Sequence, residues 1–148
     1  DEQFWVGLLS YNMTSETIEE IIERFGFPAR CRKFVRDLVS LREVLPHIDN
    51  SHISPVEVYD ILQSYSPKAI DVCIAAENEG DSLKNIIWFQ GIFPSIKPLL
   101  SGKDLLLLGI AEGPEVGEVL SLIRRAKVLG QLLSRSDEVD FVRDFVTG

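Results

Sequence analysis

Residues 100–117 read Leu-Ser-Gly-Lys-Asp-Leu-Leu-Leu-Leu-Gly-Ile-Ala-Glu-Gly-Pro-Glu-Val-Gly, and this stretch decides how the second half of the chain folds. Gly102 lacks a side chain and is suited to the left-handed conformation that ends a helix. Asp104 stands two residues later, where its carboxylate is able to cap a short helix. The apolar residues Leu105 to Leu108 supply the buried face of that helix. The first half of the stretch therefore predicts a helix end followed by a short, capped helix.

The second half of the stretch predicts a tight turn that leads into a longer helix. Gly109 to Gly113 form the turn, and Pro114 suits the first helical position, where a missing N–H costs no hydrogen bond. The first N–H groups of a helix carry partial positive charge, so a glycine-rich turn before them is a natural place for a phosphate. Gly117 has no side chain to keep another backbone away. Three basic residues follow in the same predicted helix: Arg124, Arg125 and Lys127.

Two interpretations of this corner stay open on spacing alone. A Gly-hydrophobic-x-x-Gly turn between two helices is similar to helix-hairpin-helix elements, which hold nucleic-acid backbone without reading its sequence. The alternative is a helix–loop–helix corner that only packs. The acidic residues Glu112, Glu115 and Glu118 favour this alternative because they repel phosphate.

Residues that start or end helices also occur in the rest of the chain. A run of apolar residues at helical spacing ends at Gly26, which is suited to close a helix. Ser54-Pro55 and Ser66-Pro67 each place a cap before a proline at the first helical position. The predicted helices run from Phe4 to Leu9, from Thr14 or Ser15 to Phe25, from Pro28 to near Pro46, over 55–65 and 67–79, from Asp81 or Ser82 toward Pro94, over 105–108, from Pro114 to Val128, and from Ser136 onward.

These patterns predict an all-α fold. The β-branched residues fall at helical spacing rather than in alternation, so no strand is predicted. We expect an irregular bundle of about seven to nine helices. It is expected to comprise a helical body-like region over 1–93 and a tail-like helical region over 94–148, as two domains or as one continuous domain.

The charge of the chain is negative overall but unevenly distributed. The net charge is −8 for 148 residues, which argues against a dedicated nucleic-acid binder, since such proteins usually carry a basic surface. Residues 82–135, however, hold seven Lys and Arg against four Asp and Glu, a balance of +3. A basic stretch around the glycine-rich corner therefore lies inside an acidic chain.

Residues that could carry catalysis are sparse. Cys31 and Cys73 lie far apart without a CxxC pair, which predicts buried thiols in a reducing cytosol rather than a zinc site or a disulfide framework. His47 and His52 flank Asp49 in a polar loop, and we interpret both as solvated because a metal site needs further ligands. The sequence holds no nucleophile elbow, Walker loop or GxGxxG motif. We therefore predict no catalytic residue and no metal site.

The sequence predicts no contact with a membrane. It holds no charge-free run of about 18 apolar residues, and its acidic start does not match a signal peptide. We expect a cytoplasmic protein. Because the first residue is Asp1 rather than Met, we also expect the chain to be an excerpt of a longer one.

A fixed order of residues runs through the corner and the helix after it. It consists of Leu100 to Leu105, Leu108 to Ile110, Gly113 to Gly117, Leu120, and Ala126 to Gly130. This order resembles the C-terminal region of the class II tRNA nucleotidyltransferases, which include CCA-adding, A-adding and poly(A) polymerase-like enzymes. The pattern there is similar to SGxDLxxLGxxxGPxxGxxL, followed by a helix, a glycine and an acidic last helix, which Ser136 to Phe141 fits. The resemblance covers about residues 94–146.

The resemblance implies a tRNA-binding function without catalysis in this chain. Catalysis in the family belongs to a head built on a Gly-Ser turn and an Asp-x-Asp pair, and this sequence contains neither. Mg²⁺ and ATP or CTP are therefore expected only in the missing head, and the chain is not expected to be active alone. The implied partners are tRNA and the catalytic head of the same chain. The role of holding tRNA maps onto Lys103, Gly113, Glu115, Gly117, Arg124, Arg125 and Lys127, with Gly102, Asp104, Gly109 and Pro114 as the structural motif.

An alternative function is a helical protein-interaction module or homodimer without direct RNA contact. Its evidence is a set of aromatic residues that an interface would use, although ordinary core packing explains them as well. They are Phe4, Trp5, Trp88, Phe89 and Phe93.

Overall fold

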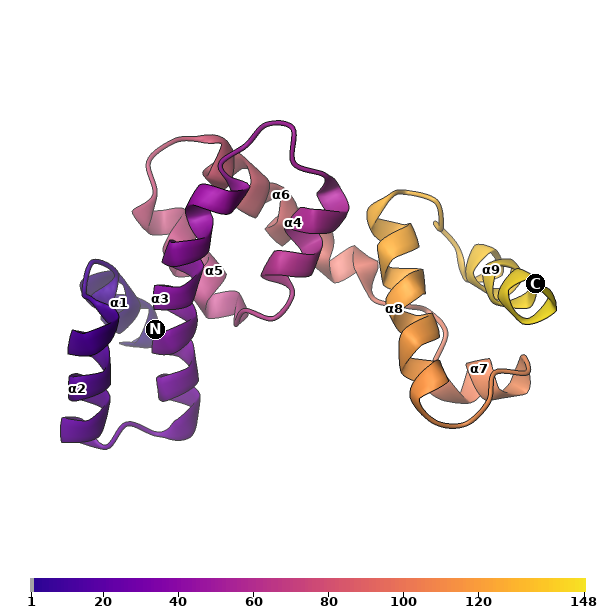
Figure 1. Cartoon of the computed structure of the whole chain (residues 1–148), viewed down its shortest axis with the longest axis horizontal. Coiled ribbons are helices and arrows are strands. Elements are labelled where there is room, and N and C mark those ends of the chain that lie inside the picture. The colour runs from indigo at the N-terminus through magenta and orange to yellow at the C-terminus, as the bar shows by residue number, and fades with distance from the viewer. Residues whose placement is uncertain (1) are drawn as a thin grey trace. The chain divides into compact units, whose positions relative to one another are not determined.

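The computed structural model describes residues 2–148, and in that part of the chain it contains nine helices and no strand (Figure 1). The predictions of an all-α fold and of seven to nine helices are confirmed. The chain divides into two compact units, the first ending at Gln90 and the second running from Gly91 to Gly148. Within residues 2–148, no helix is both long enough and apolar enough to cross a membrane.

The first unit is built around its longest helix, α3. Seven residues of α3 are buried, and it packs against α1, α2 and α5. Apolar side chains at helical spacing on several sides of α3 let it serve as the centre of the unit. The helices are α1 (Glu2–Ser10), α2 (Ser15–Phe25), α3 (Ala29–Ile48), α4 (Pro55–Leu62), α5 (Pro67–Ala76) and α6 (Asp81–Ile96), the last of which continues into the second unit.

Several helices of the first unit begin and end at the capping residues and glycines predicted from the sequence. The Thr14 hydroxyl accepts the N–H of Thr17 at the start of α2, and Gly26 ends that helix in the left-handed conformation with φ of 60°. Ser54 and Glu57 form a capping box before α4. The third helix was predicted to end near Pro46, and α3 ends two residues later at Ile48, which is completely buried.

The second unit packs α8 (Pro114–Val128) against α7 (Gly102–Leu107) and α9 (Arg135–Thr147). The predicted bounds of the helix from Pro114 to Val128 are confirmed. Its core consists of buried apolar residues from these three helices, from the segments that join them and from the segment before α7. They are Leu100, Leu105, Ile110, Val119, Ile123, Ala126, Leu132 and Val142.

Two helix starts in the second unit differ from the prediction for the same reason. Gly102 is the first residue of α7 and does not end a helix in the left-handed conformation. Ser101, not Asp104, is the cap, because its hydroxyl accepts the N–H of Asp104 while the Asp104 carboxylate accepts the N–H of Ser101. Likewise Ser134 rather than Ser136 caps α9. In each case an aspartate three residues beyond the serine completes a reciprocal capping box.

Gly7 tests how tightly α1 packs against α3 and α5. A Cβ at this position would lie 2.7 Å from Phe34 Cζ and 2.9 Å from Val72 Cγ2. We expect Gly7→Ala to lower the free energy of unfolding of the first unit by about 1–3 kcal/mol through overpacking. Urea denaturation followed by the fluorescence of Trp5 and Trp88, both in this unit, measures the change. The control is Gly91→Ala in α6, the helix that continues from the first unit into the second. A Cβ there would meet nothing within 4 Å, and an equal loss of stability in the two variants contradicts the packing described.

Candidate nucleic-acid interface

The corner between α7 and α8 requires glycine at two positions. Gly109 has φ of 103°, and Gly113 has φ of 129° with ψ of −149°, conformations that L side chains rarely adopt. Pro114 follows as the first residue of α8. The tight turn predicted from Gly109 to Gly113 therefore has a backbone reason for its glycines, and Pro114 has the role predicted for it.

Gly102 and Gly117 differ in what surrounds them. A Cβ on Gly102 would lie 3.3 Å from Val116 Cγ1, so internal packing explains a small residue there. A Cβ on Gly117 would meet nothing within 4 Å, and the residue is exposed within the second turn of α8. Glycine inside a helix costs about 1 kcal/mol relative to alanine. Packing within the chain therefore does not explain the glycine at position 117. The space left by its missing side chain faces solvent.

The two ends of α8 differ in charge. Near its start, Glu112 and Glu118 are exposed and Glu115 is partly exposed, so carboxylates surround the N–H groups where a phosphate was predicted to bind. These acids are well placed against the positive end of the helix dipole. Near its other end stand Arg124, which is partly exposed, and Arg125, which is exposed. The positive charge that could meet RNA thus lies toward the C-terminal end of α8, while Lys103 is exposed in the first turn of α7.

Lys127 was predicted to contact RNA, but the structure places it inside the unit. Its side chain is 8% exposed, and its ammonium lies 2.8 Å from Glu138 Oε1 and 3.0 Å from the carbonyl oxygen of Lys97. A lysine with these two partners in a nearly dry setting is held in place and has little surface left for a phosphate. Its role is to join α8 to α9 and to the segment before α7.

Glu138 is the partner that sequence reasoning missed. The sequence pattern places it in the acidic last helix, and the structure puts it in the first turn of α9 with its side chain completely buried. Its carboxylate accepts the N–H of Leu99 at 2.9 Å and that of Leu100 at 3.0 Å, in addition to the Lys127 ammonium. Glu138 stands four residues before the buried Val142, and therefore on the same face of α9. That spacing was the one sequence signal of its burial.

The capping carboxylates stabilise the same region from outside. The N–H and hydroxyl of Ser101 hold the pKa of Asp104 below its usual range, and the nearby Arg135 acts in the same direction. The backbone N–H groups of Leu133 and Ser134 lower the pKa of Asp137. Arg135 also donates to the Leu99 carbonyl oxygen at 2.7 Å. Both aspartates are therefore ionised at neutral pH, and their carboxylates are engaged in these hydrogen bonds.

Other polar clusters in the described residues do not form a reactive site. His47 and His52 are exposed, and residues 2–148 hold no group of three or more His, Cys, Asp and Glu arranged for a metal. The Tyr11 hydroxyl contacts the Cys73 thiol at 3.7 Å and the Glu77 carboxylate. Burial raises the pKa of Cys73 to about 11, so the thiol stays protonated at neutral pH and is a poor nucleophile.

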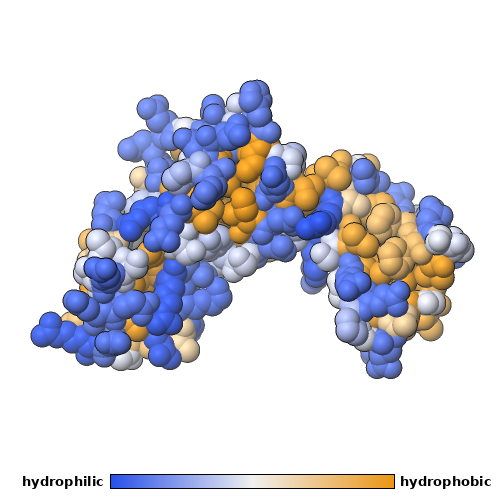
Figure 2. All heavy atoms as spheres, in the orientation of Figure 1, coloured by the Kyte–Doolittle hydropathy of each residue, from blue (hydrophilic) through white to orange (hydrophobic). Residues whose placement is uncertain are grey.

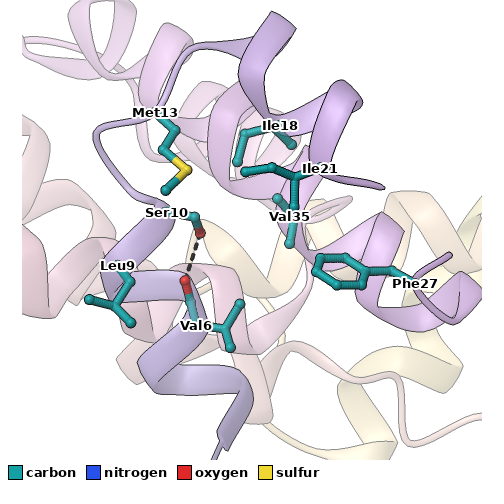
Figure 3. A pocket seen from close by; sticks show the side chains of 8 residues that line it. All are labelled: Val6, Leu9, Ser10, Met13, Ile18, Ile21, Phe27 and Val35. Atoms are coloured by element: carbon teal, nitrogen blue, oxygen red, sulfur yellow. Dashed lines mark hydrogen bonds between the residues drawn. The ribbon is translucent and has the colours of Figure 1, made fainter. Parts of the chain in front are cut away.

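An apolar pocket of about 140 Å³ lies between α1, α2 and α3 (Figure 3). Its one polar side chain, Ser10, is already used, because the hydroxyl donates to the Val6 carbonyl oxygen at 2.7 Å. The pocket therefore offers apolar contact but no hydrogen bond to orient a ligand. The residues that line it are Val6, Leu9, Ser10, Met13, Ile18, Ile21, Phe27 and Val35.

Exposed apolar residues occur in both units. Of the five aromatics considered for an interface, Phe89 is buried, Phe4 and Trp88 are partly exposed, and Trp5 and Phe93 are exposed. Apolar side chains also gather on the face of the second unit that Figure 2 shows. The exposed large apolar residues of this unit are Phe93, Leu99, Leu106, Leu107, Leu122, Leu129, Leu133, Phe145 and Val146.

In comparisons with known proteins, no family model, no curated protein and no solved structure matches the chain. The assignment to the tRNA nucleotidyltransferases therefore stays a prediction from the residue pattern.

Replacing Glu138 tests its place at the centre of the second unit. Glu138→Gln keeps the shape of the side chain but leaves Lys127 buried without a counter-charge. We expect it to lower the free energy of unfolding of this unit by about 3–5 kcal/mol. Because Trp5 and Trp88 both lie in the first unit, hydrogen exchange at the Leu99 and Leu100 amides is the better measurement.

Asp140→Asn is the matched control for Glu138→Gln. It removes the same charge from the same helix, where Asp140 forms an exposed ion pair with Arg143 at 3.8 Å. We expect this variant to change stability by less than about 0.5 kcal/mol. Equal exchange rates in the two variants would show that the buried carboxylate does not hold the segment.

Proposed function

We propose that this chain is a non-catalytic, tRNA-holding part of a tRNA nucleotidyltransferase. The α7–α8 corner is the observation that carries the proposal. The residue pattern that resembles the family includes five residues with a defined role in the corner. Ser101 and Asp104 form the capping box, Gly109 and Gly113 have positive φ, and Pro114 is the first helical residue. This agreement between the residue pattern and the local structure supports the proposal.

The proposed contact surface lies on the second unit and consists of Lys103, Gly117, Arg124 and Arg125. Three of them provide positive charge, while Gly117 permits close approach of an RNA backbone. Proteins recognise RNA duplexes mainly through shape, phosphates and 2′-hydroxyl groups, so a small set of cations on a rigid support suits this task. Lys127 supports this surface from inside through Glu138. Nucleotide addition would belong to a catalytic head that these residues do not include.

The acidic composition is compatible with this role because the two units differ in charge. Residues 1–90 hold 8 Lys and Arg against 15 Asp and Glu, whereas residues 91–148 hold seven against eight. Within the second unit, Glu138 and Asp104 are each neutralised by a basic partner, Lys127 and Arg135 respectively. Repulsion of RNA is therefore concentrated in the first unit, at the start of α8 and on α9, where Asp137, Asp140 and Asp144 lie.

Charge reversal at Arg124 tests the contact surface. Phosphate contacts release counterions, so the affinity of the chain for a tRNA transcript should fall steeply between about 50 and 200 mM salt. We expect Arg124→Glu to weaken binding about tenfold and to reduce the slope of log affinity against log salt by about one or more. Fluorescence anisotropy measures both quantities. Arg143→Glu, an equal charge change at an exposed site on α9, is the control, and equal losses in the two variants contradict the surface proposed.

Gly117→Ala separates binding from stability. Because a Cβ at this position meets nothing, alanine should raise the free energy of unfolding of the second unit by about 0.5–1 kcal/mol. If RNA backbone approaches there, the same variant should bind tRNA more weakly although it is more stable. Thermal unfolding by circular dichroism and anisotropy with tRNA provide the two readouts. Gly91→Ala should stabilise without loss of binding, and a Gly117→Ala variant that binds as well as the unmodified chain rules out close approach at this position.

The alternative of a protein-interaction module is favoured by one feature of the first unit. Trp5 and Leu9 on α1 are 63% and 77% exposed, and Leu9 also lines the apolar pocket beside them. Sedimentation of the chain with and without tRNA distinguishes the two functions. A monomer whose sedimentation shifts with tRNA supports the tRNA-holding function. A dimer whose sedimentation does not change with tRNA supports the protein-interaction module.

A further inference from the structure

The second unit contains a hollow of about 600 Å³ beside the segment that Glu138 holds. Pockets for small organic molecules typically measure about 300–1,000 Å³. The residues that line it come from the end of α6, from the segment before α7 and from α8. They are Pro94, Ser95, Lys97, Pro98, Leu99, Leu100, Ser101 and Lys127.

The lining combines an apolar wall with one available cation. Pro94, Pro98 and Leu99 provide apolar surface, and Leu99 is 51% exposed. The hydroxyl groups of the two serines donate to the Ile92 carbonyl oxygen and to Asp104, so neither is available for a ligand without giving up a bond. Lys97 is exposed, and its ammonium has no hydrogen bond or ion pair to any residue from 2 to 148. The hollow therefore attracts a group that is partly apolar and partly anionic.

The acids near the hollow do not cancel this charge. Glu138 is buried behind it and is paired with Lys127 at 2.8 Å. Asp104 is paired with Arg135 at 3.0 Å and also accepts from Ser101. With both carboxylates engaged, the positive charge of Lys97 is the one left at the rim.

The wall of the hollow is held in place before any ligand arrives. Glu138 accepts the N–H groups of Leu99 and Leu100, Arg135 donates to the Leu99 carbonyl oxygen, and Lys127 donates to the Lys97 carbonyl oxygen. These bonds use the backbone groups that could otherwise read the edge of a base. A fixed wall reduces the entropy that binding costs, and occupied backbone groups leave little to distinguish one base from another.

We propose that this hollow binds one unstacked nucleotide, with the base or ribose against Pro98 and Leu99 and the phosphate at Lys97. This inference rests on the proposed function, in which the nucleotide belongs to the bound tRNA, because RNA-binding proteins often accept bases displaced from the stack. A free nucleoside monophosphate shares the same chemistry. Binding is expected to be tolerant of base identity.

Titration with small ligands tests the hollow apart from tRNA. Amide spectra of the ¹⁵N-labelled chain are recorded with AMP, with UMP and with inorganic phosphate. We expect both nucleotides to shift the amides of Ser95, Lys97, Leu99 and Ser101 similarly, and Lys97→Ala to reduce the shifts. Phosphate alone should move Lys97 and leave the wall unchanged. Equal shifts with phosphate and AMP overturn the proposal, because they show that no base or ribose is bound.

Two pairs of variants test the hollow with tRNA. We expect Lys97→Ala to weaken tRNA binding and to reduce the salt slope by about one, whereas Lys84→Ala, an equal change at an exposed lysine of the first unit, should not. Leu99→Ala should weaken binding about threefold to tenfold at an unchanged salt slope, whereas Leu107→Ala, at an 86% exposed leucine, should not.

The outcomes separate this inference from the proposed function. If tRNA binds but both hollow variants behave like their controls, the hollow proposal is overturned and the proposed function stands. If AMP occupies the hollow but the chain does not bind tRNA, the nucleotide site is supported with a free nucleotide as its source, and the proposed function fails. If neither ligand shifts the hollow amides and tRNA does not bind, both are overturned.

Discussion

The buried carboxylate of Glu138 is the interaction on which the second unit depends. It accepts two backbone N–H groups and the Lys127 ammonium, and so ties α9 to α8 and to the segment before α7. A buried charge is tolerated only when its hydrogen bonds and counter-charge are provided together, and here both are present. These bonds hold the backbone of Lys97, Leu99 and Leu100, the segment that leads into the capping box at the start of α7.

This one arrangement also divides the basic residues of the region by role. Lys127 is held inside and Arg135 bridges the Leu99 carbonyl oxygen and Asp104, so both serve the fold. Other basic residues lie at the surface on α7, toward the end of α8 and at Lys97. The carboxylates at the start of α8 interact favourably with the positive end of the helix dipole. Their negative charge makes that end unfavourable for binding a phosphate. Residues 82–135 are basic in sequence, but only part of their positive charge is therefore presented at the surface.

The helices and several of their ends were predictable because their causes are local. Pro114 starts α8, Thr14 and Ser54 cap helices, and Gly26 closes one, since each acts through residues within one turn. The errors arose where two local devices competed or where burial intervened. Ser134 and Ser136 are both able to cap, and the capping box with Asp137 favours Ser134. The burial of Lys127 removes it from the predicted RNA contacts.

The sequence by itself determined the helical class, the glycine and proline positions of the corner, and the residue pattern that resembles a family. These depend on backbone preferences that each residue carries with it. Only the tertiary structure decided the roles of Glu138 and Lys127 and the existence of the hollow beside them. Leu99 and Glu138 are 39 residues apart, and Lys127 and Glu138 are 11 apart. No local preference indicates such partners, because the burial that pairs them exists only after α8 and α9 have packed.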